Sequence, residues 1–207
     1  MSLSKVQAES IDLTATYAFS GTVSEVDAVR NLVLLQTLTA SSSATLSFTS
    51  GIDNTYQSYV FKFIDIHPET NSASFTFNGS IDNGSNYNVV KTTTLFQAYH
   101  NEGDSNANLE YETGYDLAQS TGYQILFPAV GSDADQSCNG SLTLFDPSST
   151  TFVKHFMASG SVYNASDYNY QTYTAGYFNN TSAIDAIQFK FSSGNIDSGT
   201  IKMYGVL

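Results

Sequence analysis

The sequence predicts an all-β protein: an antiparallel, jelly-roll-like β-sandwich preceded by an extended N-terminal arm. Large apolar residues alternate with polar ones in segment after segment, which is the period of a strand with one buried face. Turn-forming Gly, Asn, Asp and Ser residues separate these segments at short intervals. Charged residues make up only 13% of the chain, and Ser, Thr, Asn and Gln, which suit wet sheet faces better than helix surfaces, replace them.

The clearest alternation lies near the C-terminus. Ile187, Phe189 and Phe191 alternate with polar residues, and Ile201 and Met203 repeat the pattern after a stretch rich in turn residues. We expect these two segments to pair as a β-hairpin with one dry face and one wet face. Because the chain closes on a strand, that strand must pair inside a sheet built by earlier residues.

Residues 1–30 differ from residues 31–207, which we expect to form the β-sandwich domain. The first segment holds few large apolar residues and cannot bury itself. An arm of this kind needs a surface to lie on, either its own domain or a neighbouring subunit. The residues expected to make this docking contact are Val6, Ile11, Leu13, Tyr17, Phe19 and Val23.

Strands are expected from the start of the second segment onward. The apolar run at 32–35 predicts a strand buried on both faces, with a short helix as the alternative. Within residues 59–66, Tyr59, Phe61 and Phe63 face one way, and Pro68 ends the strand. The other strands expected in this half are 44–50, a segment carrying Phe75 and Phe77, and 89–99.

The second half of the chain continues the pattern of short strands. We expect the strand at 122–127 to stop at Pro128. The strands at 141–145 and 151–158 should pair as a hairpin around a turn, whereas residues 161–177 have no regular pattern. With a further strand at 109–115, the total comes to about ten to twelve, as in a two-sheet sandwich.

The chain is strongly acidic, with a formal net charge of −12. Such a surface repels polyanions, so we expect no nucleic-acid partner and no contact with an anionic membrane. No apolar run approaches the roughly 18 residues of a membrane-spanning helix. The first residues lack the apolar region of a secretory signal, so we expect a protein made in the cytoplasm.

Candidate metal ligands are few. The Asp-x-Asn-x-Asn pattern from Asp104 matches the start of a calcium loop, but Leu109 and Tyr115 stand where the loop needs Gly and Glu. A looser calcium site with Asp133 or Asp135 stays open. The three histidines (His67, His100 and His155) have no partners at ligand spacing, so we expect no zinc site and no cofactor.

The sequence favours a protein without catalytic residues. Glu110 and Glu112 are two apart and share one face of a strand, as the carboxylates of a glycosidase can, but those must flank a cleft at a set distance. Two like charges on a solvated face are commoner. The single cysteine, Cys138, lacks a basic neighbourhood that would activate it, and it suits a small residue at the start of a strand.

Five tyrosines crowd into one stretch: Tyr163, Tyr168, Tyr170, Tyr173 and Tyr177. Tyrosine combines a broad apolar face with a polar tip, which suits interfaces and stacking on sugars. The alternative is that about half of them cap the core of the sandwich. We give the two interpretations equal weight.

Several segments resemble virion proteins of tailed phages. Residues 3–9 (LSKVQAE) and 17–23 (YAFSGTV) look like N-terminal segments of phage surface proteins. Residues 198–206 (SGTIKMYGV) are similar to the closing strand of phage β-sandwich structural proteins, those of marine cyanophages especially. The resemblance implies a virion component with other capsid or tail proteins as partners, commonly a homo-oligomer such as a trimer.

Because the chain has room for neither heptads nor a repetitive shaft, we favour a capsid decoration or small appendage protein. The alternative is a tail-fibre or receptor-binding module that recognises a host surface glycan through its tyrosines. A polysaccharide depolymerase that uses Glu110 or Glu112 ranks third.

Overall fold

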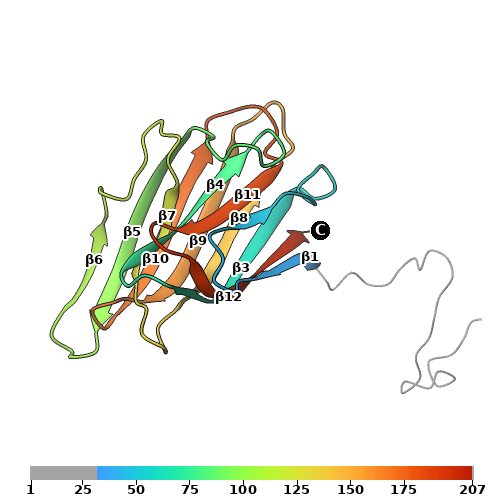
Figure 1. Ribbon diagram of the computed structural model, residues 1–207. Coiled ribbons are helices and arrows are strands. Elements are labelled where there is room, and N and C mark those ends of the chain that lie inside the picture. Colours follow the sequence, from blue (N-terminus) through green and yellow to red (C-terminus); the bar gives the residue numbers. More distant parts are fainter. Residues whose placement is uncertain (1–31, 207) are drawn as a thin grey trace, which may run out of the picture. The chain divides into compact units, whose positions relative to one another are not determined.

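The computed structural model describes residues 32–206, which form two antiparallel β-sheets packed face to face (Figure 1). This confirms the predicted β-sandwich, and no helix occurs within these residues. The predicted docking arm, with Val6, Ile11, Leu13, Tyr17, Phe19 and Val23, lies outside the described part of the chain.

The two sheets differ in width. The larger sheet has eight strands, in the spatial order β1 (Leu32–Thr39), β12 (Ile196–Val206), β3 (Ser58–Pro68), β8 (Cys138–Phe145), β9 (Lys154–Tyr163), β10 (Tyr168–Phe178), β5 (Lys91–Asn101) and β6 (Ala107–Tyr111). The smaller has four, in the order β2 (Leu46–Phe48), β11 (Ala186–Phe191), β4 (Ala73–Ser80) and β7 (Gln124–Val130).

The core between the sheets is built largely from phenylalanine. Phe61 and Phe63 point inward from β3, which confirms the alternation predicted there. The Phe63 ring meets Phe189 of β11 and Phe127 of β7 edge-on, with centroids 5.1 and 5.6 Å apart. Such edge-to-face pairs add about 0.5–1.5 kcal/mol each beyond the area they bury. These edge-to-face contacts therefore hold the two sheets together across the middle of the molecule.

The predicted C-terminal hairpin is wrong. β11 pairs with β2 and β4 in the smaller sheet, whereas β12 pairs with β1 and β3 in the larger one. Residues 192–195 thus carry the chain from one sheet to the other. Alternation of apolar residues tells which face of a strand is buried, and strands on opposite sides of one core show the same pattern. The expectation that the closing strand pairs inside a sheet is confirmed.

The apolar run at 32–35 forms a strand, but not one buried on both faces. β1 is an edge strand that pairs with β12 alone. Its register shifts between Leu34 and Gln36, and Leu35 and Leu38 pack against the core while Leu34 is 53% exposed. The outward leucines stay in contact with solvent because only the inner face of this sheet packs against a second sheet.

Strand β7 does not stop at Pro128 but continues to Val130. It is the edge strand of the smaller sheet, and its register with β4 shifts between Ala73 and Phe75. A proline is tolerated at such an irregular edge because its missing N–H is not needed for the ladder. The hairpin predicted around residues 146–149 is confirmed, since β8 pairs with β9.

Residues 161–177 are more regular than the sequence suggested. They contain the end of β9 and nearly all of β10, which pairs with β5 along its whole length and with β9 from Asn169 onward. Cys138 is buried at the first position of β8, as expected for a small residue at a strand start, and burial raises the pKa of its thiol.

Candidate functional site

The candidate site lies on the inner face of the larger sheet, at the end of β10 where the chain enters from β9. Farther along β10, the inward residues Thr172, Thr174 and Phe178 are buried, whereas Tyr168 and Tyr170 are only half-buried. Next to them, β5 and β6 form the margin of the sheet, at the left in Figure 1. The narrower second sheet therefore leaves this corner of the inner face open.

Strand geometry divides the five predicted tyrosines into two groups. Tyr168 and Tyr170 point to the inner face of β10, and Tyr173 and Tyr177 point to the outer face, because successive side chains alternate. Tyr163 on β9 also points outward. The structure thus brings Tyr168 and Tyr170 together and separates them from the other three.

A third tyrosine completes the inner group. Tyr99 of β5 stands directly across from Tyr170 in the register of β10 and β5. Its ring centroid is 5.7 Å from that of Tyr168 and 5.6 Å from that of Tyr170, and the last two are 5.8 Å apart. Three aromatic faces therefore share one small area of the sheet.

Two carboxylates lie beside the tyrosines. Glu110 of β6 and Glu112 just beyond it are both reached by the buried Gln97 side chain, whose Nε2 donates to Glu112 Oε1 at 2.8 Å and to Glu110 Oε1 at 3.4 Å. The prediction that the two glutamates share a face is confirmed. Burial and the adjacent Glu110 raise the pKa of the Glu112 carboxyl.

These groups enclose a shallow groove of about 370 Å³. We call it the tyrosine groove, defined by Gln97, Tyr99, Glu110, Glu112, Tyr168 and Tyr170. No lysine or arginine is among the residues that line it. Its walls therefore offer aromatic faces and hydrogen-bond acceptors, without a cation to neutralise the carboxylates.

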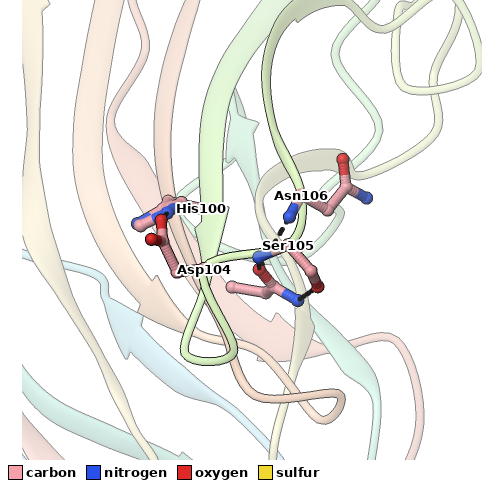
Figure 2. Close-up of polar contacts among 5 residues, drawn as sticks. His100, Asp104, Ser105 and Asn106 are labelled. Carbon is pink, nitrogen blue, oxygen red and sulfur yellow. Dashed lines mark hydrogen bonds and ion pairs between the residues drawn. The ribbon is translucent and has the colours of Figure 1, made fainter.

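A tight turn after β5 borders the groove and fixes one of its polar groups. Asn101 Oδ1 accepts hydrogen bonds from the backbone N–H of Ser105 at 3.0 Å and of Asn106 at 2.9 Å (Figure 2). Asn106 Nδ2 in turn donates to the Tyr168 hydroxyl at 3.3 Å. The turn thereby holds an amide next to an aromatic ring of the groove.

The calcium-loop pattern falls in the same turn. The Asp104 carboxylate contacts His100 Nε2 at 3.0 Å (Figure 2), and neither Asp133 nor Asp135 joins it in a cluster. Within residues 32–206, no group of three or more His, Cys, Asp or Glu side chains is placed to hold a metal ion. No metal site is assigned to this turn.

A second, more polar hollow of about 400 Å³ lies at the same end of the sheet. Tyr168 lines both hollows. In the second one, the Tyr163 hydroxyl donates to Glu102 Oε1 at 2.9 Å, and this hydrogen bond is the main reason that the pKa of Tyr163 rises to about 12. Tyr163 therefore keeps its proton at physiological pH, and its hydroxyl is hydrogen-bonded within its own chain.

Sequence reasoning missed Tyr99 and Gln97, and it considered Asn106 only as part of the calcium-loop pattern. Tyr99 and Gln97 are two apart on β5, so their shared face follows from the period of two. What the sequence does not reveal is that β5 lies next to β10. Comparison with family models, curated proteins and solved structures finds no match for this chain. In the described residues, no helix is long and apolar enough to span a membrane.

Proposed function

We propose that this protein is a non-enzymatic surface component of a tailed-phage particle, and that its sandwich is a module that recognises a host surface glycan. The observation that carries the proposal is the tyrosine groove. Pyranose rings have apolar faces that stack on aromatic rings such as Tyr99, Tyr168 and Tyr170. Their hydroxyl groups donate hydrogen bonds, for which Glu110 and Glu112 are strong acceptors.

The proposal of a phage particle rests on the sequence. The segments at 3–9, 17–23 and 198–206 are those that resemble phage surface proteins. This resemblance implies two roles, capsid decoration and receptor binding. The groove favours receptor binding, since a decoration protein needs no open, aromatic-lined site. Receptor binding therefore takes the first place and capsid decoration the second.

The arrangement of the glutamates argues for binding without catalysis. Glycosidase carboxyl groups flank the scissile bond from two sides. Glu110 and Glu112 instead lie side by side on one wall, where both contact the single amide of Gln97. Hydrolysis of a host polysaccharide by the purified protein, abolished by Glu110→Gln, would contradict this assignment.

Removal of two aromatic rings tests the groove. We expect the double variant Tyr168→Ala/Tyr170→Ala to bind purified host surface polysaccharide at least tenfold more weakly than the wild type. Each stacking contact contributes about 1 kcal/mol, and about 1.4 kcal/mol corresponds to tenfold in affinity. Isothermal titration calorimetry measures the difference.

The matched control lies on the other face of the same sheet. Tyr177→Ala/Tyr204→Ala removes two tyrosine side chains from the outer face, outside the groove, and should leave the affinity unchanged. Equal loss in both double variants, or no loss in either, contradicts a site in the tyrosine groove.

The second candidate function is a capsid decoration or small appendage protein that joins the particle through residues 1–30. The apolar side chains on the outer face of the larger sheet favour it, since assembly proteins need contact surfaces. Deletion of residues 1–30 should leave a folded, soluble sandwich that no longer joins the particle. Particle purification followed by immunoblotting measures this, and normal incorporation of the truncated protein counts against it.

A further inference from the structure

The outer face of the larger sheet carries a continuous group of exposed apolar side chains, which we call the outer patch. Its members and their exposed fractions are Phe96 (42%), Tyr111 (57%), Phe145 (40%), Met157 (59%) and Tyr173 (41%). Phe96 stands across from Tyr173 of β10 on one side and Tyr111 of β6 on the other. Exposed apolar surface on this scale marks a contact site.

The patch has both a ridge and a hollow. The rings of Phe96 and Tyr173 stack with their centroids 4.9 Å apart and form the ridge. Beside them lies a hollow of about 430 Å³ whose lining includes the small residues Ser141 and Ser159, together with Met157 and Phe145. A surface with a ridge next to a hollow can fit a second copy of itself through a twofold axis, ridge into hollow.

The distribution of charge indicates the same partner. The chain has 19 acidic residues and a net charge of −12, so two copies repel each other over most of their surfaces. The outward positions of four neighbouring strands carry no Asp or Glu. They are Ser141, Thr143 and Phe145 on β8; His155, Met157, Ser159 and Ser161 on β9; Gln171, Tyr173, Ala175 and Tyr177 on β10; and Thr92, Thr94, Phe96 and Ala98 on β5.

This face therefore suits a partner that is itself acidic. A basic partner would be drawn to the carboxylates elsewhere on the protein, whereas a second copy of this chain meets no carboxylate at the outward positions of these four strands. The size is also sufficient: five strands about 4.8 Å apart and seven residues of about 3.3 Å each cover roughly 20 by 20 Å. The surface buried on both copies together then comes to about 1,000 Å², because protruding side chains add to the flat area of the two faces. This value is the lower limit for a specific interface.

We propose that the outer patch is the contact between two copies of this protein in a twofold-symmetric dimer. The proposal is independent of glycan binding, because the tyrosine groove lies on the opposite face of the sheet and stays open in both copies. It replaces the expected trimer with a dimer whose two sandwiches meet sheet to sheet.

Sedimentation equilibrium of the full chain tests the dimer. The wild type should have the mass of a dimer at micromolar concentration, and both Met157→Glu and Tyr173→Glu should shift it to the monomer, since each would bury a carboxylate without a basic partner in an apolar contact. The matched control is Leu34→Glu, because Leu34 is comparably exposed (53%) but lies on β1, outside the patch. This variant should remain dimeric.

Circular dichroism and thermal unfolding check that each variant is folded. We expect all of them to fold, because the substituted positions are exposed. A wild type that is monomeric or trimeric overturns the proposal, as does a dimer that survives both patch substitutions. So does a dimer lost on deletion of residues 1–30, because the arm, and not a second sandwich, would then make the contact.

Discussion

At the scale of single residues, two buried lysines close one end of the core. Lys91 of β5 and Lys154 of β9 both stand across from Phe178, the last residue of β10. The Lys91 Nζ donates to the carbonyl of Gly122 at 2.6 Å, and the Lys154 Nζ donates to that of Asn180 at 3.1 Å. Neither contact is with a carboxylate, and burial lowers the pKa of both side chains, that of Lys91 to about 7.

This shift makes stability depend on pH. In the unfolded chain Lys91 has its ordinary pKa of 10.5, so between pH 7 and 10.5 the unfolded state binds a proton that the folded state does not. Stability should therefore rise with pH in this window, by about 2 kcal/mol between pH 7 and 9. Below pH 7 the burial penalty is present in full.

Urea unfolding of the wild type and of Lys91→Met at pH 7, 8 and 9 measures this contribution. We expect the difference in free energy of unfolding between the two proteins to change by about 2 kcal/mol over this range. Lys62→Met, at an exposed position of β3, is the control and should keep the pH dependence of the wild type. An unchanged slope in Lys91→Met would show that Lys91 is not the group responsible.

At the scale of elements, the β8–β9 hairpin makes room for the smaller sheet. Gly140 and Gly160 stand across from each other in the register of these strands. A Cβ added at Gly140 would come within 2.7 Å of the Phe127 ring on β7, and one added at Gly160 would overlap the same ring. The two glycines thus allow Phe127 to approach the backbone of the larger sheet.

Gly160→Ala should consequently lower the free energy of unfolding by about 1–3 kcal/mol, the usual cost of overpacking a core. Gly114→Ala is the matched control, because an added Cβ there has no atom within 4 Å. Urea unfolding measures both variants. Equal stability of the two would mean that the space above Gly160 can be filled without moving Phe127.

At the scale of the whole molecule, the unequal widths of the two sheets create both candidate surfaces. Eight strands face four, so part of the inner face is left open at the β5–β6 margin and becomes the tyrosine groove. The outer face has no covering layer at all within the described residues, and its central strands carry the outer patch. The outward positions of β8, β9, β10 and β5 carry no carboxylate, and the Asp116 carboxylate, which accepts a hydrogen bond from the Tyr111 hydroxyl, lies at the margin of the patch.

The tyrosines show how far the site could be predicted. Had β10 been recognised as a strand, its period of two would have separated Tyr168 and Tyr170 from Tyr173 and Tyr177. The interface interpretation treated the five residues as one group, and the core interpretation assigned about half of them to the core without saying which; in the structure Tyr170 is one that packs against the core. Tyr99 could not have been joined to them, since the choice of neighbouring strand depends on contacts far apart in sequence.

The class of fold, the inward faces of strands such as β3 and the turns between them follow from the amino-acid sequence, because they depend on local alternation and turn chemistry. Which strands are neighbours follows from the folded molecule: β11 and β12 lie in different sheets, and β5 lies beside β10. Burial of an apolar face is equally favourable on either side of the core, so alternation does not select the sheet that a strand joins. The partner of each strand is selected by the packing of the whole chain, so a groove assembled from β10, β5 and β6 exists only once the sheet has formed.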